Sequence, residues 1–261
     1  MGRIRVAASD ESNEARSFEI KGDLSGYTGN WSLFYDTNIV NNTFAFKLHS
    51  ENDLGTPSAF AANALLLGYG CVVTPQETDV TIDDANRGVT FAAALPKGGS
   101  TRIGAAFNLA HDFTVKTPVV FQSGTFAVNG TGTFAFGAGG VTAEDGVTLA
   151  VGSGAAVKPQ GKDAMKGMTI ALADGAVIAF DAEACPIDLT ETTLKNAGDT
   201  CLVRIDGLQN EATIATFASA EIAAAVVANA KIVKGTGHKG YLFADGATVK
   251  AGVSGLVIIA R

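Results

Sequence analysis

Three charged residues close together in the sequence have the side chains that acid–base chemistry needs. Asp83 and Asp84 are adjacent carboxylates, Arg87 follows shortly after them, and Asp79 lies upstream. Paired carboxylates can act as general acid and base on a glycosidic bond or as Ca²⁺ ligands, with a nearby guanidinium to balance negative charge. This group is the candidate site of a polysaccharide lyase or a glycoside hydrolase. The alternative is a strand that ends in a turn at residues 81–88, with Arg87 bound to loop carbonyls or to Asp84.

Aromatic side chains gather near the N-terminus, in a stretch that also contains glycine and asparagine. The aromatic residues are Tyr27, Trp31, Phe34 and Tyr35. Exposed rings beside amide groups can stack on sugars and hydrogen-bond to them. Tyr27, Trp31 and Tyr35 are therefore the candidate glycan-binding residues. The alternative is that Trp31 and Phe34 cover the N-terminal end of the hydrophobic core.

The histidines, cysteines and glycine-rich segments form no recognisable metal or cofactor motif. The three histidines are far apart, and the three cysteines lack the paired spacing of a zinc site. A disulfide between Cys185 and Cys201 is the alternative to free cysteines. Residues 235–240 match Gly-x-Gly-x-x-Gly, but the residues after them predict a strand and a turn. A dinucleotide site needs a helix at that position. We therefore expect no resident metal and no cofactor.

Composition and charge exclude several classes of protein. The 261 residues are 47% hydrophobic and 17% charged, which excludes intrinsic disorder, and the net charge is −7. Lys and Arg form no basic stripe, so nucleic acid is not an expected partner. No apolar run is long enough to insert into a membrane as a helix, and no signal peptide is recognisable. Because residues 2–6 already resemble a strand, we expect the chain to be a fragment of a larger protein.

A short phrase recurs along the chain: a glycine, often after aspartate, followed by alternating or β-branched residues. It occurs at residues 124–128, 132–136, 146–151, 175–180, 246–249 and 255–259. Asp-Gly favours a turn, and short alternating strands separated by turns predict an all-β protein. Repetition of one such unit predicts stacked rungs, each of which buries its apolar side against its neighbours.

The predicted fold is a single-stranded, right-handed parallel β-helix, also called a β-solenoid, that includes residues 1–261 as a single domain. Residues 1–215 form the rungs, and residues 216–261 form a C-terminal cap made of a helix and the final strands. The helix is predicted from Ser219 to Lys231, because Ser219 is a favourable N-cap and alanines follow it. Such a helix would cover the open backbone edge of the last rung.

Several segments resemble the autotransporter-associated β-strand repeats found in bacterial passenger proteins. The resemblance rests on residues 18–29, 54–60, 65–68, 80–83, 86–90, 113–116 and 123–126. It covers roughly two thirds of the chain, and the last part matches only loosely. It implies a β-helix from a large bacterial cell-surface or secreted protein that is adhesive or acts as a stalk. The family's signal peptide and outer-membrane barrel have no counterpart in this sequence. The sequence therefore does not indicate an export route.

A second, weaker resemblance concerns the acidic group. Asp83 and Asp84 resemble the paired aspartates of polygalacturonases, and residues 237–240 faintly resemble their Gly-His-Gly motif. The histidine is far from the aspartates in this sequence, and no Arg-x-Lys follows it. Adjacent residues on a strand also face opposite sides of the sheet, so only one aspartate could face a given cleft.

We expect a non-enzymatic structural or adhesive β-helix segment of a bacterial secreted or cell-surface protein. Its expected partner is a glycan or a host or cell-surface protein. The alternatives are a carbohydrate-active β-helix of the pectate lyase or polygalacturonase type, with Asp83, Asp84 and Arg87 at its site, and a glycan-binding module. The sequence does not predict an oligomeric state.

Overall fold

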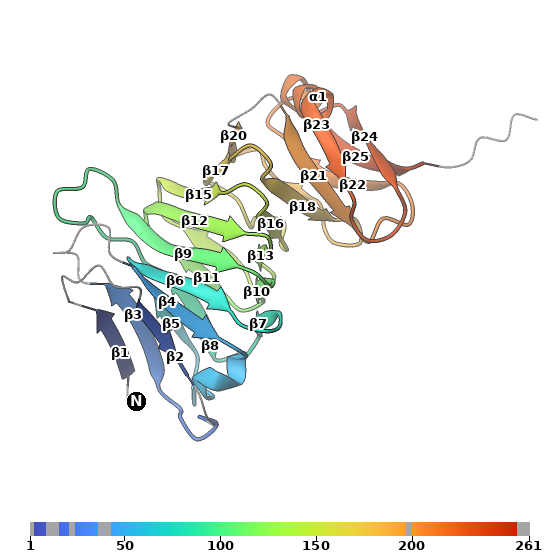
Figure 1. The fold of residues 1–261 in the computed structure, drawn as a ribbon. Helices are drawn as coiled ribbons and strands as arrows, with labels where there is room; N and C mark the ends of the chain where they lie inside the picture. Colours follow the sequence, from blue (N-terminus) through green and yellow to red (C-terminus); the bar gives the residue numbers. More distant parts are fainter. Residues whose placement is uncertain (1–2, 9–15, 21–23, 36–42, 197–199, 255–261) are drawn as a thin grey trace, which may run out of the picture.

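Parallel strands wind into a β-solenoid of about eight turns in the computed structural model (Figure 1). The structure describes residues 3–8, 16–20, 24–35, 43–196 and 200–254. Along its middle part, successive strands join three parallel sheets in a fixed order, which we name sheets A, B and C. The predicted all-β fold, the parallel β-helix and the helix near its C-terminal end are confirmed. The recurring phrase at residues 255–259 lies outside the described residues.

The three sheets form the walls of the β-helix. Sheet A contains β1 (Arg3–Ala8), β3 (Asn30–Tyr35), β5 (Ala61–Leu67), β8 (Arg87–Phe91), β11 (Val119–Phe121) and β14 (Val141–Ala143). Sheet B contains β2 (Arg16–Glu19), β4 (Phe44–Leu48), β6 (Cys71–Pro75), β9 (Ile103–Leu109), β12 (Gly124–Gly130), β15 (Val147–Val151), β17 (Thr169–Leu172) and β20 (Thr193–Asn196). Sheet C contains β7 (Val80–Ile82), β10 (Phe113–Val115), β13 (Thr133–Phe136), β16 (Ala156–Pro159), β18 (Val177–Asp181), β21 (Cys201–Asp206) and β23 (Ala230–Val233).

A fourth sheet, sheet D, follows sheet A toward the C-terminus. Its order is β19 (Ile187–Asp188), β22 (Ala212–Thr216), β25 (Thr248–Val253) and β24 (Gly240–Asp245). The first two strands are parallel, whereas β25 is antiparallel to both β22 and β24. The final strands therefore close the fold as an antiparallel group rather than as further rungs.

Period-two alternation explains why these segments stack as strands. In sheet B, Thr125, Thr148, Thr169 and Thr193 pair across consecutive rungs. The next residue of each strand is apolar and faces the interior; these residues are Phe126, Leu149, Ile170 and Leu194. Because like residues repeat in register, each rung continues the core of the one below it.

Phenylalanine forms the centre of this core. The rings of Phe107 and Phe134 stack with their centroids 4.4 Å apart, and those of Phe91 and Phe121 stack at 4.7 Å. All four side chains have no exposed surface. Aromatic rings contribute large apolar areas and favour such offset or tilted pairs. The packing therefore links consecutive rungs through side chains that are distant in sequence.

Gly130 shows how closely the rungs approach one another. Its φ is +97°, and a Cβ built there would lie 2.3 Å from the carbonyl oxygen of Leu109 on the rung below. Only glycine adopts this conformation readily and leaves room for that carbonyl. The glycine therefore serves a close backbone contact as well as a turn.

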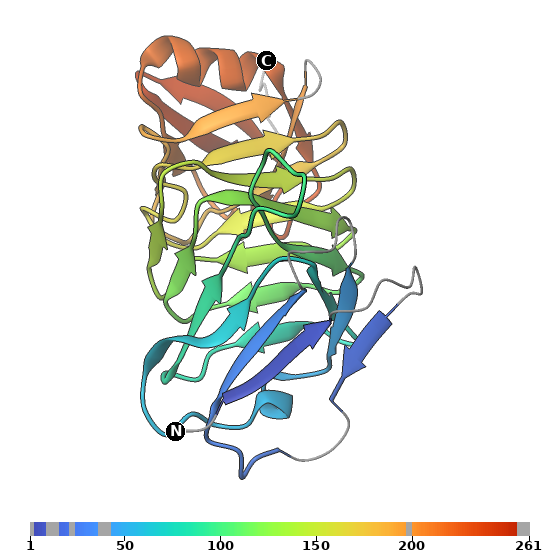
Figure 2. The same ribbon diagram turned by 90° about the vertical axis from the view of Figure 1, so that its left-hand side faces the viewer.

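The helix α1 (Ala220–Asn229) takes the place of a strand. In the preceding turn, the chain passes from sheet D to sheet B and then to sheet C; after β22 it forms α1 and then enters β23. Ser219 caps the helix by accepting a hydrogen bond from the backbone N–H of Ile222, as the sequence predicts. Figure 2 shows the helix and the N-terminal strands at opposite ends of the stack.

A short 3₁₀ helix, η1 (Glu51–Leu54), is present near the N-terminal end. The rungs also continue past the expected boundary at residue 215, because β23 extends sheet C after the helix. In the described part of the chain, no helix is long and apolar enough to cross a membrane.

Candidate functional site

The predicted acidic group lies at a turn that ends in a buried arginine. Arg87, at the start of β8, has no exposed surface. Its Nε donates to Oε1 of Glu51 at 2.9 Å, and its Nη2 donates to the carbonyl oxygen of Gly55. The guanidinium therefore lies inside the fold and joins η1 to the strand that begins one turn later in the chain.

Glu51 is the second half of this interior pair. Its Oε2 accepts hydrogen bonds from the backbone N–H groups of Asp83 at 2.7 Å and Asp84 at 3.0 Å. Burial raises the pKa of the Glu51 carboxyl group, and the two N–H donors and Arg87 act in the opposite direction. The Glu51 carboxylate thus binds both the turn that follows β7 and the guanidinium of Arg87.

The two predicted aspartates lie at the outer side of this turn. Asp83 is exposed and its Oδ2 is 3.6 Å from Nζ of Lys116. Asp84 is half-buried, and its Oδ1 accepts a hydrogen bond from the backbone N–H of Asn86 at 2.9 Å. This is the geometry of an aspartate that stabilises a turn. The structure brings all three predicted residues together, but Arg87 faces the interior.

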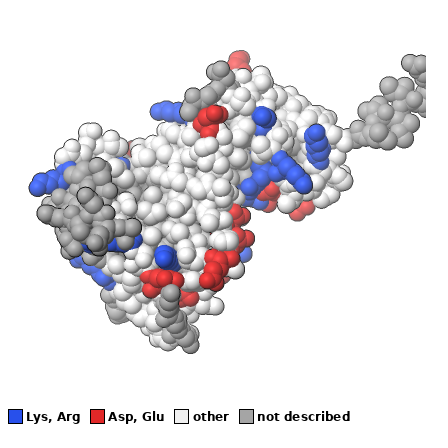
Figure 3. Space-filling view, in the orientation of Figure 1, with Lys and Arg blue, Asp and Glu red and all other residues white. Residues whose placement is uncertain are grey.

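Two further aspartates hydrogen-bond the next rung instead of facing a cleft. Asp79 accepts a hydrogen bond from the backbone N–H of Asp112 at 2.9 Å, and Asp112 accepts one from the N–H of Thr133 at 2.7 Å. Figure 3 shows acidic side chains along this flank of the β-helix, beside β7 and β10. Each carboxylate replaces a backbone acceptor at a corner between sheets.

The aromatic residues near the N-terminus are divided between the core and the surface. Trp31 and Tyr35 are buried, and the indole N–H of Trp31 donates to the carbonyl oxygen of Leu54 at 2.9 Å. Tyr27 is half-buried, and its hydroxyl binds the backbone of the neighbouring strands. Phe34 lies outside the core, with the guanidinium of Arg5 4.5 Å from its ring centre. Glycan binding by Tyr27, Trp31 and Tyr35 stays a prediction, and it would require Trp31 and Tyr35 to leave the core.

A second charged cluster lies on sheet C and has no motif in the sequence. Nζ of Lys158 is 3.0 Å from Oδ2 of Asp206 and 3.2 Å from Oδ2 of Asp181. Arg204 lies 3.3 Å from Asp206 and also donates to the hydroxyl of Thr133. Burial alone would raise the pKa of Asp206, but the hydrogen bond from Lys158 and the two cations hold it below its usual value.

A repeat alignment could have indicated this cluster. Asp181 and Asp206 both end strands of sheet C, each directly after an apolar residue, and the two pair in register. Stacked carboxylates repel one another, so a cation between them is expected. Lys158 supplies that cation from β16, one rung before Asp181 and two before Asp206, and this separation along the chain hides it from local sequence patterns.

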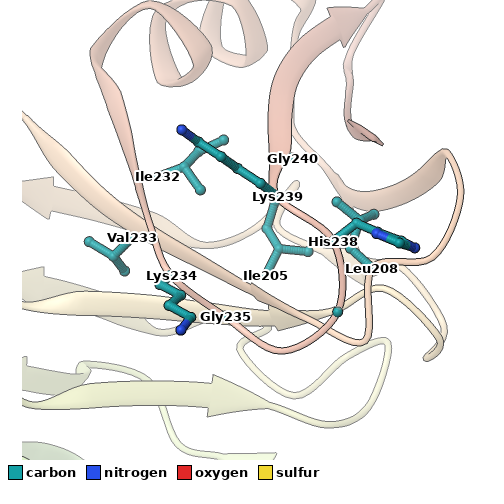
Figure 4. Close-up of a pocket in the computed structure, with 10 residues that line it drawn as sticks. Ile205, Leu208, Ile232, Val233, Lys234, Gly235, His238, Lys239 and Gly240 are labelled. Carbon is teal, nitrogen blue, oxygen red and sulfur yellow. The ribbon is translucent and has the colours of Figure 1, made fainter. Parts of the chain in front are cut away.

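A pocket of about 470 Å³ opens at the C-terminal end of sheet C (Figure 4). Its apolar lining consists of Ile205, Leu208, Ile232 and Val233. The loop that follows β23 forms its rim and contributes Lys234, Gly235, Gly237, His238, Lys239 and Gly240. The Gly-x-Gly-x-x-Gly segment therefore borders a cavity, although no helix begins there.

The cysteines are free thiols. Cys71 and Cys201 are buried, Cys185 is exposed, and the structure contains no Cys185–Cys201 bond. Burial raises the pKa of the Cys71 and Cys201 thiols, so both behave as small apolar side chains. Among the residues that the structure describes, no group of three or more His, Cys, Asp or Glu side chains could hold a metal ion.

These features define the class of the protein as a β-solenoid with an α-helix near its C-terminal end. No protein-family model matches the chain, and comparisons with curated proteins and with solved structures also found no match.

Proposed function

We propose that this chain is a non-enzymatic β-helical segment of a bacterial secreted or cell-surface protein, and that it provides reach or adhesion. The observation that supports this proposal most strongly is the hydrophobic core, which is a single cluster from Ile20 to Ala251. In the middle rungs, the Phe107–Phe134 and Phe91–Phe121 stacks join consecutive rungs within this cluster. A stack of this kind is stiff, and its length increases with the number of rungs.

The use of charge within the fold also supports a structural role. Arg87 and Glu51 pair in the interior, and Lys158 links two aspartates across rungs. A catalytic carboxylate or guanidinium must be able to contact its substrate. In this structure these groups already have partners that hold turns and strands in place.

The proposed partner of an adhesive segment is a glycan or a protein on a host or bacterial surface. The proposal can be separated from a carbohydrate-active enzyme by electrophoresis of the purified chain in gels that contain plant, microbial or host polysaccharides. Each lane is then assayed for new reducing or unsaturated ends. Retardation without new ends supports adhesion, and a chain that is neither retarded nor active supports a stalk or a protein-binding role.

Appearance of new ends would contradict the proposal, and it would direct attention to the turn after β7. Asp84→Ala should then abolish the new ends while the chain stays folded, with only the small loss of stability expected from a missing turn hydrogen bond. Asp174→Ala is the matched control, because Asp174 is an exposed aspartate in a different turn, the one that follows β17. A structural segment gives no new ends with any of the three proteins.

The proposed location can be tested separately on cells that produce the parent protein. Protease added to intact cells should remove epitopes of this chain if it lies outside the cell. Epitopes that resist the protease on intact cells and are removed only after the cells are opened would contradict an extracellular or surface location.

A further inference from the structure

The pocket at the C-terminal end of sheet C is the uncovered interior of the β-helix. Ile205 on β21 and Ile232 on β23 belong to neighbouring strands whose alternate residues face the core. In Figure 4 the loop after β23 curves around Ile205, and Leu208 lies beside this loop; both residues line the pocket. An apolar group placed there would continue the core by one more rung.

The strand beside the pocket also has a free backbone edge. β23 is the last strand of sheet C and pairs only with β21 within the described part of the chain. Unpaired N–H and C=O groups on such an edge can accept an added strand. A parallel strand would place its carboxyl end at the same end as that of β23, next to Lys234.

Charge at the rim indicates what this added strand should contain. Lys234, His238 and Lys239 line the pocket, and no carboxylate does. Neither lysine forms an ion pair with another residue that the structure describes, although the whole chain has a net charge of −7. The rim therefore complements an anion, whereas the base complements an apolar side chain.

We propose that this pocket binds the C-terminal end of an extended polypeptide that has an apolar last residue and a free α-carboxylate. The peptide adds to the edge of β23 as a parallel strand and places an apolar side chain over Ile205 and Ile232. Its carboxylate lies at the rim that carries Lys234 and Lys239, beside the glycine-rich loop. This inference rests on the pocket alone and does not require the proposed role in a surface protein.

The direct test is fluorescence polarisation with the full chain and a labelled pentapeptide, Ser-Val-Thr-Val-Ile, with a free C-terminus. The same peptide with a C-terminal amide is the matched probe, because it differs only in the carboxylate. We expect saturable binding of the acid and binding of the amide that is about tenfold weaker or more. Equal affinities, or no saturable binding of the acid, would overturn the proposal.

Variants of the pocket locate the binding. Lys234→Ala and Lys239→Ala should each weaken binding of the acid about threefold to fivefold and leave binding of the amide nearly unchanged. Lys231→Ala is the matched control, because Lys231 is an exposed lysine on the same strand that does not line the pocket. An equal loss in Lys231→Ala would show a general charge effect and would overturn the proposal.

The apolar base is tested with Ile232→Asp, and thermal melting checks that the variant is folded. A folded variant that binds as well as the unaltered chain would overturn the proposed position of the peptide. Light scattering of the unaltered chain tests the other possible occupant, a second copy. A dimer that Ile232→Asp dissociates would show that the same edge is an interface between copies, and it would also overturn the proposal.

Discussion

At the scale of single residues, the Arg87–Glu51 pair joins two turns that are distant in sequence. Arg87 is completely buried, and its guanidinium binds both a carboxylate and the Gly55 carbonyl. Replacing Arg87 by alanine leaves Glu51 partly buried without its cation. We expect Arg87→Ala to reduce the free energy of unfolding by about 3–5 kcal/mol, as measured by urea denaturation.

The matched control for this prediction is Lys116→Ala. Lys116 forms an exposed ion pair with Asp83, and such pairs contribute about 0–1 kcal/mol. A loss in Arg87→Ala as small as that in Lys116→Ala would show that the interior pair does not stabilise the fold.

Trp31 allows core packing to be distinguished from glycan binding. Its ring is 2% exposed and lies against Tyr27, with the ring centroids 5.5 Å apart. Trp31→Ala should therefore cost about 3–5 kcal/mol of stability, because it opens a cavity at the N-terminal end of the core. Tyr27→Phe removes only a hydroxyl and should cost about 1 kcal/mol. Loss of glycan affinity in Trp31→Ala with an unchanged melting temperature would instead show that the indole acts at the surface.

The lowered pKa of Asp206 predicts a pH dependence of stability. A carboxyl group whose folded pKa lies below its ordinary value of 3.8 stabilises the fold above that value. The contribution is lost as the pH falls through the folded pKa. Asp206→Asn should therefore be less stable than the unaltered chain at neutral pH, and the difference should shrink toward zero in acid. Urea denaturation across this range measures the difference, and a constant gap would contradict the assignment.

Sequence patterns explain some of these residues and not others. The adjacency of Asp83, Asp84 and Arg87 placed them correctly in one turn, because a turn is a local structure. Glu51 was missed because it is far from Arg87 along the chain, and only the stacking of rungs brings them together. Burial likewise depends on the whole fold, so the sequence left open whether the aromatic rings face solvent.

At the scale of elements, α1 takes the place of a strand between β22 and β23 and contacts β24 and β25. Its N-terminus depends on Ser219, whose hydroxyl accepts a hydrogen bond from the backbone N–H of Ile222. Ser219→Ala should destabilise the protein by about 1 kcal/mol, because it leaves a helix N–H without its side-chain partner. Thermal denaturation followed by circular dichroism measures this change. Ser219→Asp should restore most of the stability, and failure of this rescue would contradict a capping role.

The elements were predictable where the signal is local. Glycine followed by alternating residues correctly indicated β12, β13 and β15, and serine before an alanine-rich run indicated α1. The antiparallel pairing of β24 and β25 was not predictable from that phrase. A strand's partner depends on which edge is free when the chain returns, and the residues of the strand alone do not specify it.

At the scale of the whole molecule, the stacked rungs share one continuous core, although a single rung is not stable alone. A single rung cannot bury its own apolar side, so each rung depends on its neighbours. Phe134 illustrates this, because its ring contacts Phe91, Phe107, Phe113 and Phe136. We expect Phe134→Ala to cost about 3–5 kcal/mol and to weaken the middle of the stack rather than its ends.

Single-molecule force spectroscopy tests most directly whether the chain is a stiff stack of rungs. The chain is held by its two ends between marker domains of known unfolding force. We expect the chain to unfold at a force comparable to the unfolding force of the marker domains. Unfolding should then proceed in several steps, each of which releases about 7–8 nm of chain, the extended length of one rung. Phe134→Ala should lower the force of the middle steps only. A single opening of the whole chain at a force far below that of the markers would contradict the account.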